Sequence, residues 1–226
     1  MKLEKITEKS PRSYEDACAT AHALDLLGER WALLVMRELM LGPRRFGDLR
    51  ASLPAISANV LTQRLEGLEG AGVVRRRKLP PPASVQVYEL TEWGLEAEPI
   101  LLSLGKWAVR SPRHDPTLPL SPVALMLSFR AKFEAGKARG LDISMAFRFG
   151  AESFSVGVVD GVLITERGEP RRTDAVVSGS PSAIAGLAYG KLPLAELEQQ
   201  GALEIAGDRA ALQRFADLFE MLPKAG

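Results

Sequence analysis

The most constraining feature of this chain is the stretch of residues 43–78, which combines two short helical patterns, a turn and a basic strand. Residues 43–50 begin a short amphipathic helix, and residues 53–56, Leu-Pro-Ala-Ile, turn the backbone. Residues 57–65 start a second helix, and residues 73–78 follow as a strand rich in arginine. Two short helices around a tight turn, followed by a strand, predict a winged helix-turn-helix.

The second helix of this pattern carries side chains suited to contact DNA bases. Ser57 is a good N-cap, and Ile56 and Leu61 have the spacing of a hydrophobic staple. Because leucines recur at helical spacing from Leu61 onward, that stripe faces the core and the polar side chains face outward. Polar side chains at the start of a recognition helix can bond base edges in the major groove. The residues of this helix expected to contact DNA are Ser57, Asn59, Thr62, Gln63 and Arg64.

Charge is concentrated on the same segment. The whole chain has a net charge of +1, but residues 43–78 hold eight basic and three acidic residues, whereas residues 111–226 hold thirteen and fourteen. Such a local excess is what a phosphate-binding surface needs. The excess favours DNA binding over the alternative of a winged helix that serves only protein contacts. Phosphate contacts are expected from the start of the first helix and from the wing strand, namely Arg44, Arg45, Arg75, Arg76, Arg77 and Lys78. Because side chains alternate along a strand, about half of the wing residues can face DNA.

Several motifs of residues 14–108 together resemble the HxlR-type winged helix-turn-helix regulators, a group with a MarR-like fold. The matching segments are Ala23 to Trp31, Gly42 to Phe46, Ile56-Ser57, Val60-Leu61, Arg64-Leu65, Leu68-Glu69, Gly72 to Val74 and Tyr88 to Glu92. The resemblance implies a bacterial transcription factor that pairs as a homodimer through its first and last helices and binds two-fold related, double-stranded operator DNA.

The second half of the chain follows a different pattern. Residues 110–119 contain three prolines and few apolar residues, which predicts a linker between two domains. Beyond it, a helix leads into three alternating strand patterns joined by tight turns, then a fourth strand, a helix, a short strand and a final helix. The expected organisation is α+β, with a winged helix-turn-helix domain in residues 1–109, the linker in 110–119 and an α+β domain in 120–226.

Residues 120–222 resemble the sterol carrier protein family. The resemblance rests on Phe147 to Phe149, Phe154 to Val156, Asp160 to Leu163, Asp174 to Ile184 and Gly201 to Asp208. It implies a sheet covered by helices around a cavity for a lipid or another hydrophobic ligand. The candidate lining residues are Phe129, Phe133, Phe154, Val156, Leu187, Tyr189, Phe215 and Phe219. The same side chains would serve equally well as an ordinary packed core.

The lone cysteine, Cys18, permits no internal disulfide, which suits a reducing cytoplasm. Its position near the start of the first helix resembles the oxidant-sensing or electrophile-sensing cysteine of some HxlR-type regulators. Glu15 and Asp16 oppose the thiolate, so a buried, unreactive cysteine is the favoured alternative. With only His22 and His114 and no catalytic or metal-binding motif, we expect no enzyme activity, metal or cofactor. No apolar run is long enough for a membrane span, and no signal peptide is present.

The predicted function is therefore that of a cytoplasmic, homodimeric transcriptional regulator, with a hydrophobic small-molecule effector bound by the second domain. Three alternatives stay open. One is a DNA-binding regulator that senses oxidants or electrophiles through Cys18. Another is a hydrophobic-ligand carrier whose winged helix only dimerises. The third is a DNA-binding regulator whose second domain is a structural or dimerising element.

Overall fold

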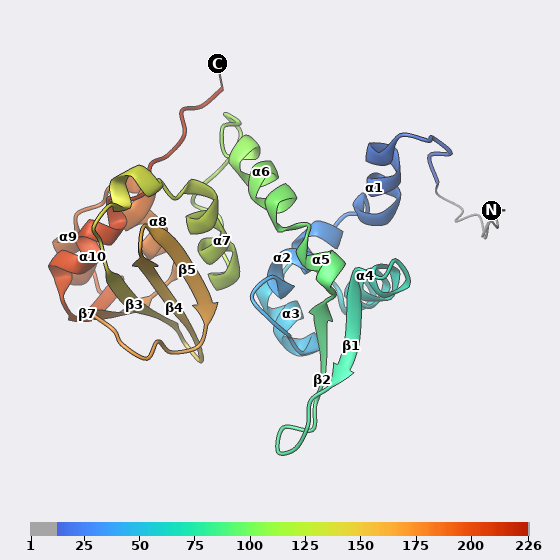
Figure 1. Cartoon of the computed structure of the whole chain (residues 1–226), viewed down its shortest axis with the longest axis horizontal. Helices are drawn as coiled ribbons and strands as arrows, with labels where there is room; N and C mark the ends of the chain where they lie inside the picture. Colours follow the sequence, from blue (N-terminus) through green and yellow to red (C-terminus); the bar gives the residue numbers. More distant parts are fainter. Residues whose placement is uncertain (1–12, 226) are drawn as a thin grey trace. The chain divides into compact units, whose positions relative to one another are not determined.

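Residues 13–225 are described in a computed structural model of the chain (Figure 1). Its contacts divide the chain into two compact units. The first unit holds the described residues up to Leu39 together with Pro43–Leu95. The second holds Met40–Gly42 and the described residues from Glu96 onward. The division by contacts therefore falls before the predicted linker of residues 110–119.

The first unit has the order expected of a winged helix-turn-helix. Its elements are α1 (Ala19–Leu27), α2 (Ala32–Leu39), α3 (Phe46–Ser52), α4 (Ala58–Gly70), β1 (Val74–Lys78), β2 (Gln86–Leu90) and α5 (Glu92–Leu95). Helix α4 contacts α1, α2 and β1, and β1 pairs with β2 in an antiparallel hairpin. The predicted winged helix-turn-helix is confirmed.

The apolar pattern of residues 95–107 predicts one long helix over residues 92–108. This prediction is wrong, because the structure divides the segment into α5 and α6 (Glu98–Ala108). Pro99 lies in the first turn of α6. Proline has no amide hydrogen, and its ring clashes with the preceding turn, so it is tolerated at a helix start and disrupts a helix interior. The sequence therefore starts a new helix at this point, and by its contacts α6 belongs to the second unit.

The second unit is an α+β domain built on a five-stranded sheet. Its remaining elements are α7 (Pro122–Lys132), the 3-10 helix η1 (Ala135–Ala138), β3 (Ile143–Phe149), β4 (Glu152–Val159), β5 (Val162–Arg167), β6 (Ala175–Gly179), α8 (Pro181–Gly190), α9 (Leu194–Gln199), β7 (Leu203–Gly207) and α10 (Arg209–Ala216). The strand order is β5-β4-β3-β6-β7, with β3 and β6 parallel and the other pairs antiparallel. The five predicted strands are confirmed, and α9 and η1 were not predicted.

Alternate strand residues put large apolar side chains on one face of the sheet. Met145, Phe147, Phe154, Val156 and Val177 are fully buried. Helices α7 and α10 contact the sheet, and Figure 1 shows helices gathered on one side of it. The β4–β5 connection is a two-residue turn in which Asp160 and Gly161 both have positive φ, as an Asp-Gly hairpin requires. The core of the second unit therefore lies between one sheet face and the helices.

A polar cluster fixes α6 to the rest of the second unit. The guanidinium of Arg130 on α7 donates to both carboxylate oxygens of Glu98 on α6, at 2.7 and 2.9 Å. It also donates to the hydroxyl and the carbonyl oxygen of Thr165 on β5, each at 2.6 Å. One arginine thus joins two helices and an edge strand of the sheet.

Candidate nucleic-acid interface and the interior of the second unit

Helix α4 starts and packs as its sequence predicts. The Ser57 hydroxyl accepts a hydrogen bond from the Val60 amide at 3.3 Å, which caps the first turn. Leu61, Leu65 and Leu68 are buried at helical spacing, so one side of α4 is committed to the core of the first unit. The other side is left for solvent.

The solvent side of α4 consists of short polar side chains. Asn59, Thr62 and Gln63 are exposed, and Ser57 is exposed at the N-terminal end. Amide side chains can bond adenine at two atoms, and hydroxyls can bond several base edges. The predicted exposure of these four residues is confirmed, and their contact with bases stays a prediction.

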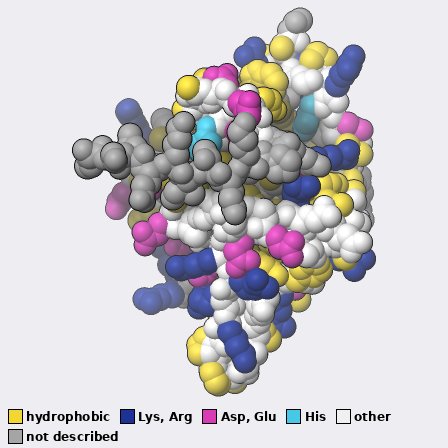
Figure 2. Space-filling model, turned by 90° about the vertical axis from the view of Figure 1, so that its right-hand side faces the viewer, with side chains coloured by type: hydrophobic (Ala, Val, Ile, Leu, Met, Phe, Trp, Pro, Cys, Tyr) yellow, Lys and Arg dark blue, Asp and Glu magenta, His cyan; other side chains and the backbone are white. Residues whose placement is uncertain are grey.

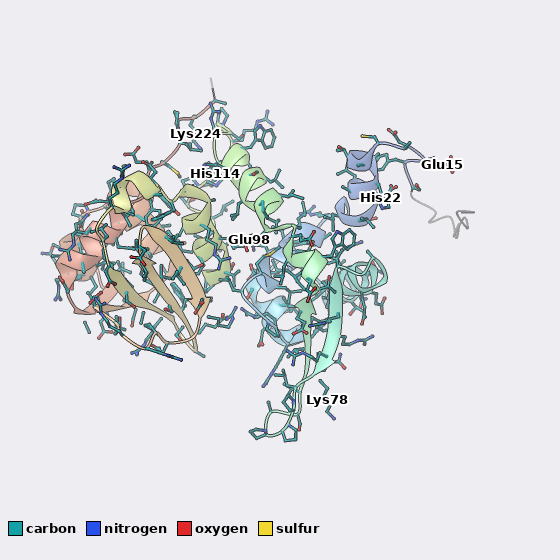
Figure 3. All side chains as sticks on the ribbon, viewed as in Figure 1. Glu15, His22, Lys78, Glu98, His114 and Lys224 are labelled. Carbon is teal, nitrogen blue, oxygen red and sulfur yellow. The ribbon has the colours of Figure 1, made fainter. Side chains whose placement is uncertain are left out.

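The β1–β2 hairpin divides the basic wing residues between its two faces. The strand register sets Arg75 opposite Glu89, and Arg77 follows on the same face. Arg76 and Lys78 lie on the other face. Figure 2 shows basic side chains along the protruding hairpin, and Lys78 lies toward its tip in Figure 3.

Glu89 binds both arginines of its face. Arg75 Nε donates to Glu89 Oε1 at 2.7 Å, and Arg77 donates through Nε and Nη2 to the two oxygens at 3.0 and 2.8 Å. Only 8% of the surface of Glu89 is exposed. The hydrogen bond from Arg77 is the main cause that lowers the pKa of Glu89, which keeps this carboxylate ionised.

Glu89 was not among the predicted site residues, although the sequence carries one signal of its role. An acid between apolar positions of a strand, placed opposite an arginine run, suggests a cross-strand ion pair once the register is known. On the other face of the hairpin, Arg76 contacts Glu69 of α4 at 3.2 Å, with both side chains partly exposed. Arg76 is therefore held more weakly than the two arginines on Glu89.

Two of the predicted DNA-binding arginines have partners within the first unit. Arg44 is only 5% exposed, and its guanidinium donates to the Ser52 hydroxyl at 3.0 Å. Its backbone pairs with Tyr88 of β2. The side chain of Arg64 is 18% exposed and contacts Glu29 at 3.2 Å. Contact of Arg44 and Arg64 with phosphate stays a prediction, and Arg45 is exposed as expected.

The predicted ligand-lining residues come together in the second unit as a packed aromatic cluster. Phe129, Phe215 and Phe219 contact one another, with ring centroids 4.7–5.3 Å apart, and the Tyr189 ring is 6.1 Å from that of Phe129. Rings at these distances contact each other. Phe154, Val156 and Leu187 are also buried, and Phe133 is partly buried with its ring 6.4 Å from that of Phe219. A ligand among these rings would require them to move apart, so their role in ligand binding stays a prediction.

A partly buried polar group lies beside this cluster and was not predicted. The hydroxyls of Ser128 on α7 and Tyr189 on α8 are hydrogen-bonded at 2.7 Å. The ammonium group of Lys132, one turn after Ser128, lies 3.9 Å from the centre of the Tyr189 ring. Burial lowers the pKa of Lys132 to about 8 and raises the pKa of Tyr189. A sequence pattern cannot distinguish this lysine from an exposed one on the same helix.

A surface hollow of about 270 Å³ lies at the end of α6 and is lined by Trp107, Ala108, Arg110, Ser111 and Ala225. None of these belongs to the predicted ligand-lining set. Its volume is below the range of about 300–1,000 Å³ typical of small-molecule sites. The hollow therefore adds no support to the predicted cavity.

Cys18 is exposed and occupies the N-cap position of α1, so the expectation of a buried cysteine is wrong. The sequence pattern predicts a first helix from Tyr14 to Leu27, but α1 starts at Ala19, which leaves Cys18 outside the first turn. The backbone amides of Ala21 and Thr20 lower the pKa of the Cys18 thiol. The effect of the helix N-terminus thus outweighs that expected from the neighbouring acids.

Residues 13–225 contain neither a metal-binding cluster nor a membrane-spanning helix. No group of three or more His, Cys, Asp or Glu side chains there could hold a metal ion. None of the helices in this part of the chain is long and apolar enough to cross a membrane.

The fold and the polar edge of α4 define the first unit as a DNA-binding winged helix-turn-helix, and the comparisons agree. Residues 26–115 match the HxlR-like helix-turn-helix family. The HTH-type transcriptional regulator YvaP of Bacillus subtilis is 41% identical over 86 residues, which are 38% of this chain and 80% of YvaP. YodB of the same organism, also an HTH-type transcriptional regulator, is 37% identical over 86 residues, 38% of this chain and 77% of YodB. The chain belongs to the HxlR-like family of helix-turn-helix transcriptional regulators.

The second unit matches a family other than the one that its sequence resembled. Residues 120–224 match the alkyl sulfatase C-terminal family, so they form an alkyl sulfatase-like C-terminal domain. The sterol carrier identity is not confirmed. Among solved structures, the sec-alkylsulfatase Pisa1 from Pseudomonas sp. has 22% identity and a TM-score of 0.43, over 46% of this chain and 17% of Pisa1. The expected absence of enzyme activity stays a prediction, because this family takes its name from an enzyme.

Proposed function

We propose that the protein is a one-component transcriptional regulator that binds operator DNA as a homodimer and is controlled by a hydrophobic effector in its second unit. The exposed polar edge of α4, followed in the chain by a basic hairpin, is the observation that carries this proposal. Asn59, Thr62 and Gln63, with Ser57, contact base edges, whereas Arg45 and the wing contact phosphates. A regulator of this kind acts in the cytoplasm.

Exposed apolar side chains support the homodimer. Ile100, Leu104 and Trp107 lie at helical spacing on α6 and are 61%, 43% and 73% exposed. On α1, Leu24 is also exposed. A two-fold pair of chains would bury such surfaces against themselves, and it would present two copies of α4 to an operator of matching symmetry.

The family of the second unit suggests the chemistry of the effector. Alkyl sulfates are amphiphiles with an apolar chain and an anionic head, and the aromatic cluster around Phe129 offers an apolar environment. An amphiphile that enters this cluster would separate its rings and shift α7, which carries Phe129. Because Arg130 of α7 holds Glu98 of α6, the shift would reach α6, which follows the wing and α5 in the chain.

Selection from a pool of random duplexes tests DNA binding directly. The purified full chain is expected to enrich a two-fold related sequence and to bind it more tightly than a scrambled duplex. Adding decyl sulfate or decan-1-ol at submicellar concentration is expected to change the affinity for the enriched duplex. Failure to retain any duplex in 50 mM salt, together with displacement of a fluorescent lipid from the protein, would support the carrier alternative instead.

A second candidate function has its own observation, because Cys18 is exposed and the pKa of its thiol is lowered. A thiolate at this position would react with electrophiles. N-ethylmaleimide is then expected to alter operator affinity in the wild type and to leave C18S unchanged. Equal responses of the two proteins would remove the sensing role.

A further inference from the structure

One carboxylate on the wing holds two guanidinium groups. Arg75 and Arg77 lie on one face of β1, and both donate to Glu89 on β2 at 2.7–3.0 Å. The pairing is part of the sheet itself, since the register sets Arg75 directly opposite Glu89. The two arginines therefore have a fixed orientation before any DNA is bound.

The burial of Glu89 makes this arrangement stable. Its side chain is only 11% exposed, whereas those of Arg75 and Arg77 are 64% and 43% exposed. A carboxylate removed from water requires charged partners, and leaving it unpaired would be costly. The guanidiniums thus cover the carboxylate from the solvent side, and their own charge is partly neutralised.

The partner of Arg76 on the opposite face differs. Arg76 makes one contact of 3.2 Å with Glu69, whose side chain is 33% exposed. An exposed ion pair of this kind contributes little and exchanges readily with water or phosphate. Glu89 therefore restrains its two arginines much more strongly than Glu69 restrains Arg76.

We propose that Glu89 is a positioning residue of the DNA interface: it orients Arg75 and Arg77 and withholds part of their charge from phosphates. This inference rests on the proposed function. Phosphate contacts bind all DNA sequences alike, whereas the polar edge of α4 distinguishes them. The hold of Glu89 on the wing therefore lowers the affinity for every duplex by a similar factor and leaves the distinction between sequences to α4.

The test compares E89Q with wild type on the selected duplex and on a scrambled duplex of equal length, at several salt concentrations between 50 and 200 mM. E89Q removes the carboxylate charge that holds both arginines. Its affinity for the scrambled duplex at 50 mM salt is expected to rise about three- to tenfold, and its salt slope to steepen by about 0.9 for each phosphate newly neutralised. The affinity for the selected duplex is expected to rise by a similar factor, so that the ratio of the two affinities stays near its wild-type value.

E69Q is the matched control, because it makes the same change in charge at the other wing contact. It is expected to produce less than half the effect of E89Q. In an R75M/R77M background, E89Q is expected to leave the salt slope unchanged, because the two arginines that Glu89 holds are then absent. E89L serves as a second variant without the carboxylate, and thermal unfolding verifies that each protein is folded.

Equal or weaker binding of the scrambled duplex by folded E89Q or E89L would overturn the inference, since a merely structural role for Glu89 predicts that result. An effect of E69Q as large as that of E89Q would also overturn it. These outcomes differ from failure of the proposed function, in which the wild type itself retains no duplex.

Discussion

The two units differ in where their candidate functional residues lie: on the surface in the first unit and in the interior in the second. In the first unit, the candidate chemistry lies outside, on the exposed residues Asn59, Thr62 and Gln63 and on the wing. In the second unit, the candidate ligand site coincides with the core, where Phe129 and Phe219 are fully buried. An exposed polar edge on an amphipathic helix needs a partner to explain it, whereas a buried aromatic residue is already explained by folding. For this reason, the function of the first unit is better defined than that of the second.

Replacing the central ring of the aromatic cluster tests this contrast most severely. Phe129 contacts Phe147, Phe215, Phe219 and Tyr189, so F129A is expected to destabilise the second unit by about 3–5 kcal/mol. DNA binding by the first unit should persist at temperatures where both units remain folded. Denaturant unfolding followed by circular dichroism gives the stability. L118A, which truncates an exposed leucine, is the control. Loss of DNA binding by folded F129A would show that the first unit requires an intact aromatic cluster in order to bind DNA.

The next largest effect is expected from removing the contacts of Arg130, which join α6 to the rest of the second unit. R130M removes the four hydrogen bonds that join α7 to Glu98 and Thr165, and it is expected to cost about 2–3 kcal/mol. Amide hydrogen exchange in α6 should become faster, because α6 loses its charged contact with the rest of the second unit. R139M, a change of an exposed arginine, should leave that exchange unaltered. Unchanged amide protection of α6 in R130M would show that contacts other than the one between Arg130 and Glu98 stabilise this helix.

Local patterns in the sequence predicted most of the fold. Helix α4 was predicted from its cap and leucine spacing, and the five strands of the second unit from their alternation. Pro99 could have indicated the break between α5 and α6. The continuous apolar pattern of residues 95–107 concealed it, because periodicity records which face is buried and not where a backbone hydrogen bond is missing.

The candidate site was harder to predict, because burial and pairing depend on neighbours distant in sequence. Arg44 and Arg45 are adjacent and chemically identical, yet only Arg45 is exposed, since the backbone of Arg44 pairs with Tyr88. Glu89 acquires its role only when the strand register places it opposite Arg75, 14 residues earlier. Lys132 likewise has an unusual environment because Tyr189 comes from another helix.

The proposed base contacts predict a smaller effect, a loss of affinity for the selected duplex when Asn59 of the first unit is replaced. N59A is expected to cost about 1–3 kcal/mol in binding to the selected duplex, and to leave binding to a scrambled duplex and the salt slope unchanged. E66A alters another exposed residue of α4 and serves as the control. Affinities from fluorescence anisotropy on both duplexes measure the difference. A loss that is equal on the two duplexes would assign Asn59 to phosphate contact instead.

The smallest predicted effect is a pH dependence of folding stability that Lys132 causes in the second unit. Burial lowers the pKa of Lys132 to about 8, compared with the ordinary lysine value of 10.5. Between these two pH values the unfolded chain holds a proton that the folded chain has lost, so unfolding takes up a proton and stability increases with pH. The stability of the wild type relative to K132M is therefore expected to rise by about 1 kcal/mol from pH 8 to pH 10. K106M, at an exposed lysine, should show no such trend against the wild type. If the difference between wild type and K132M stayed constant over this range, the ammonium group of Lys132 would be solvated, and the second unit would contain more water around Tyr189 than its packed rings indicate.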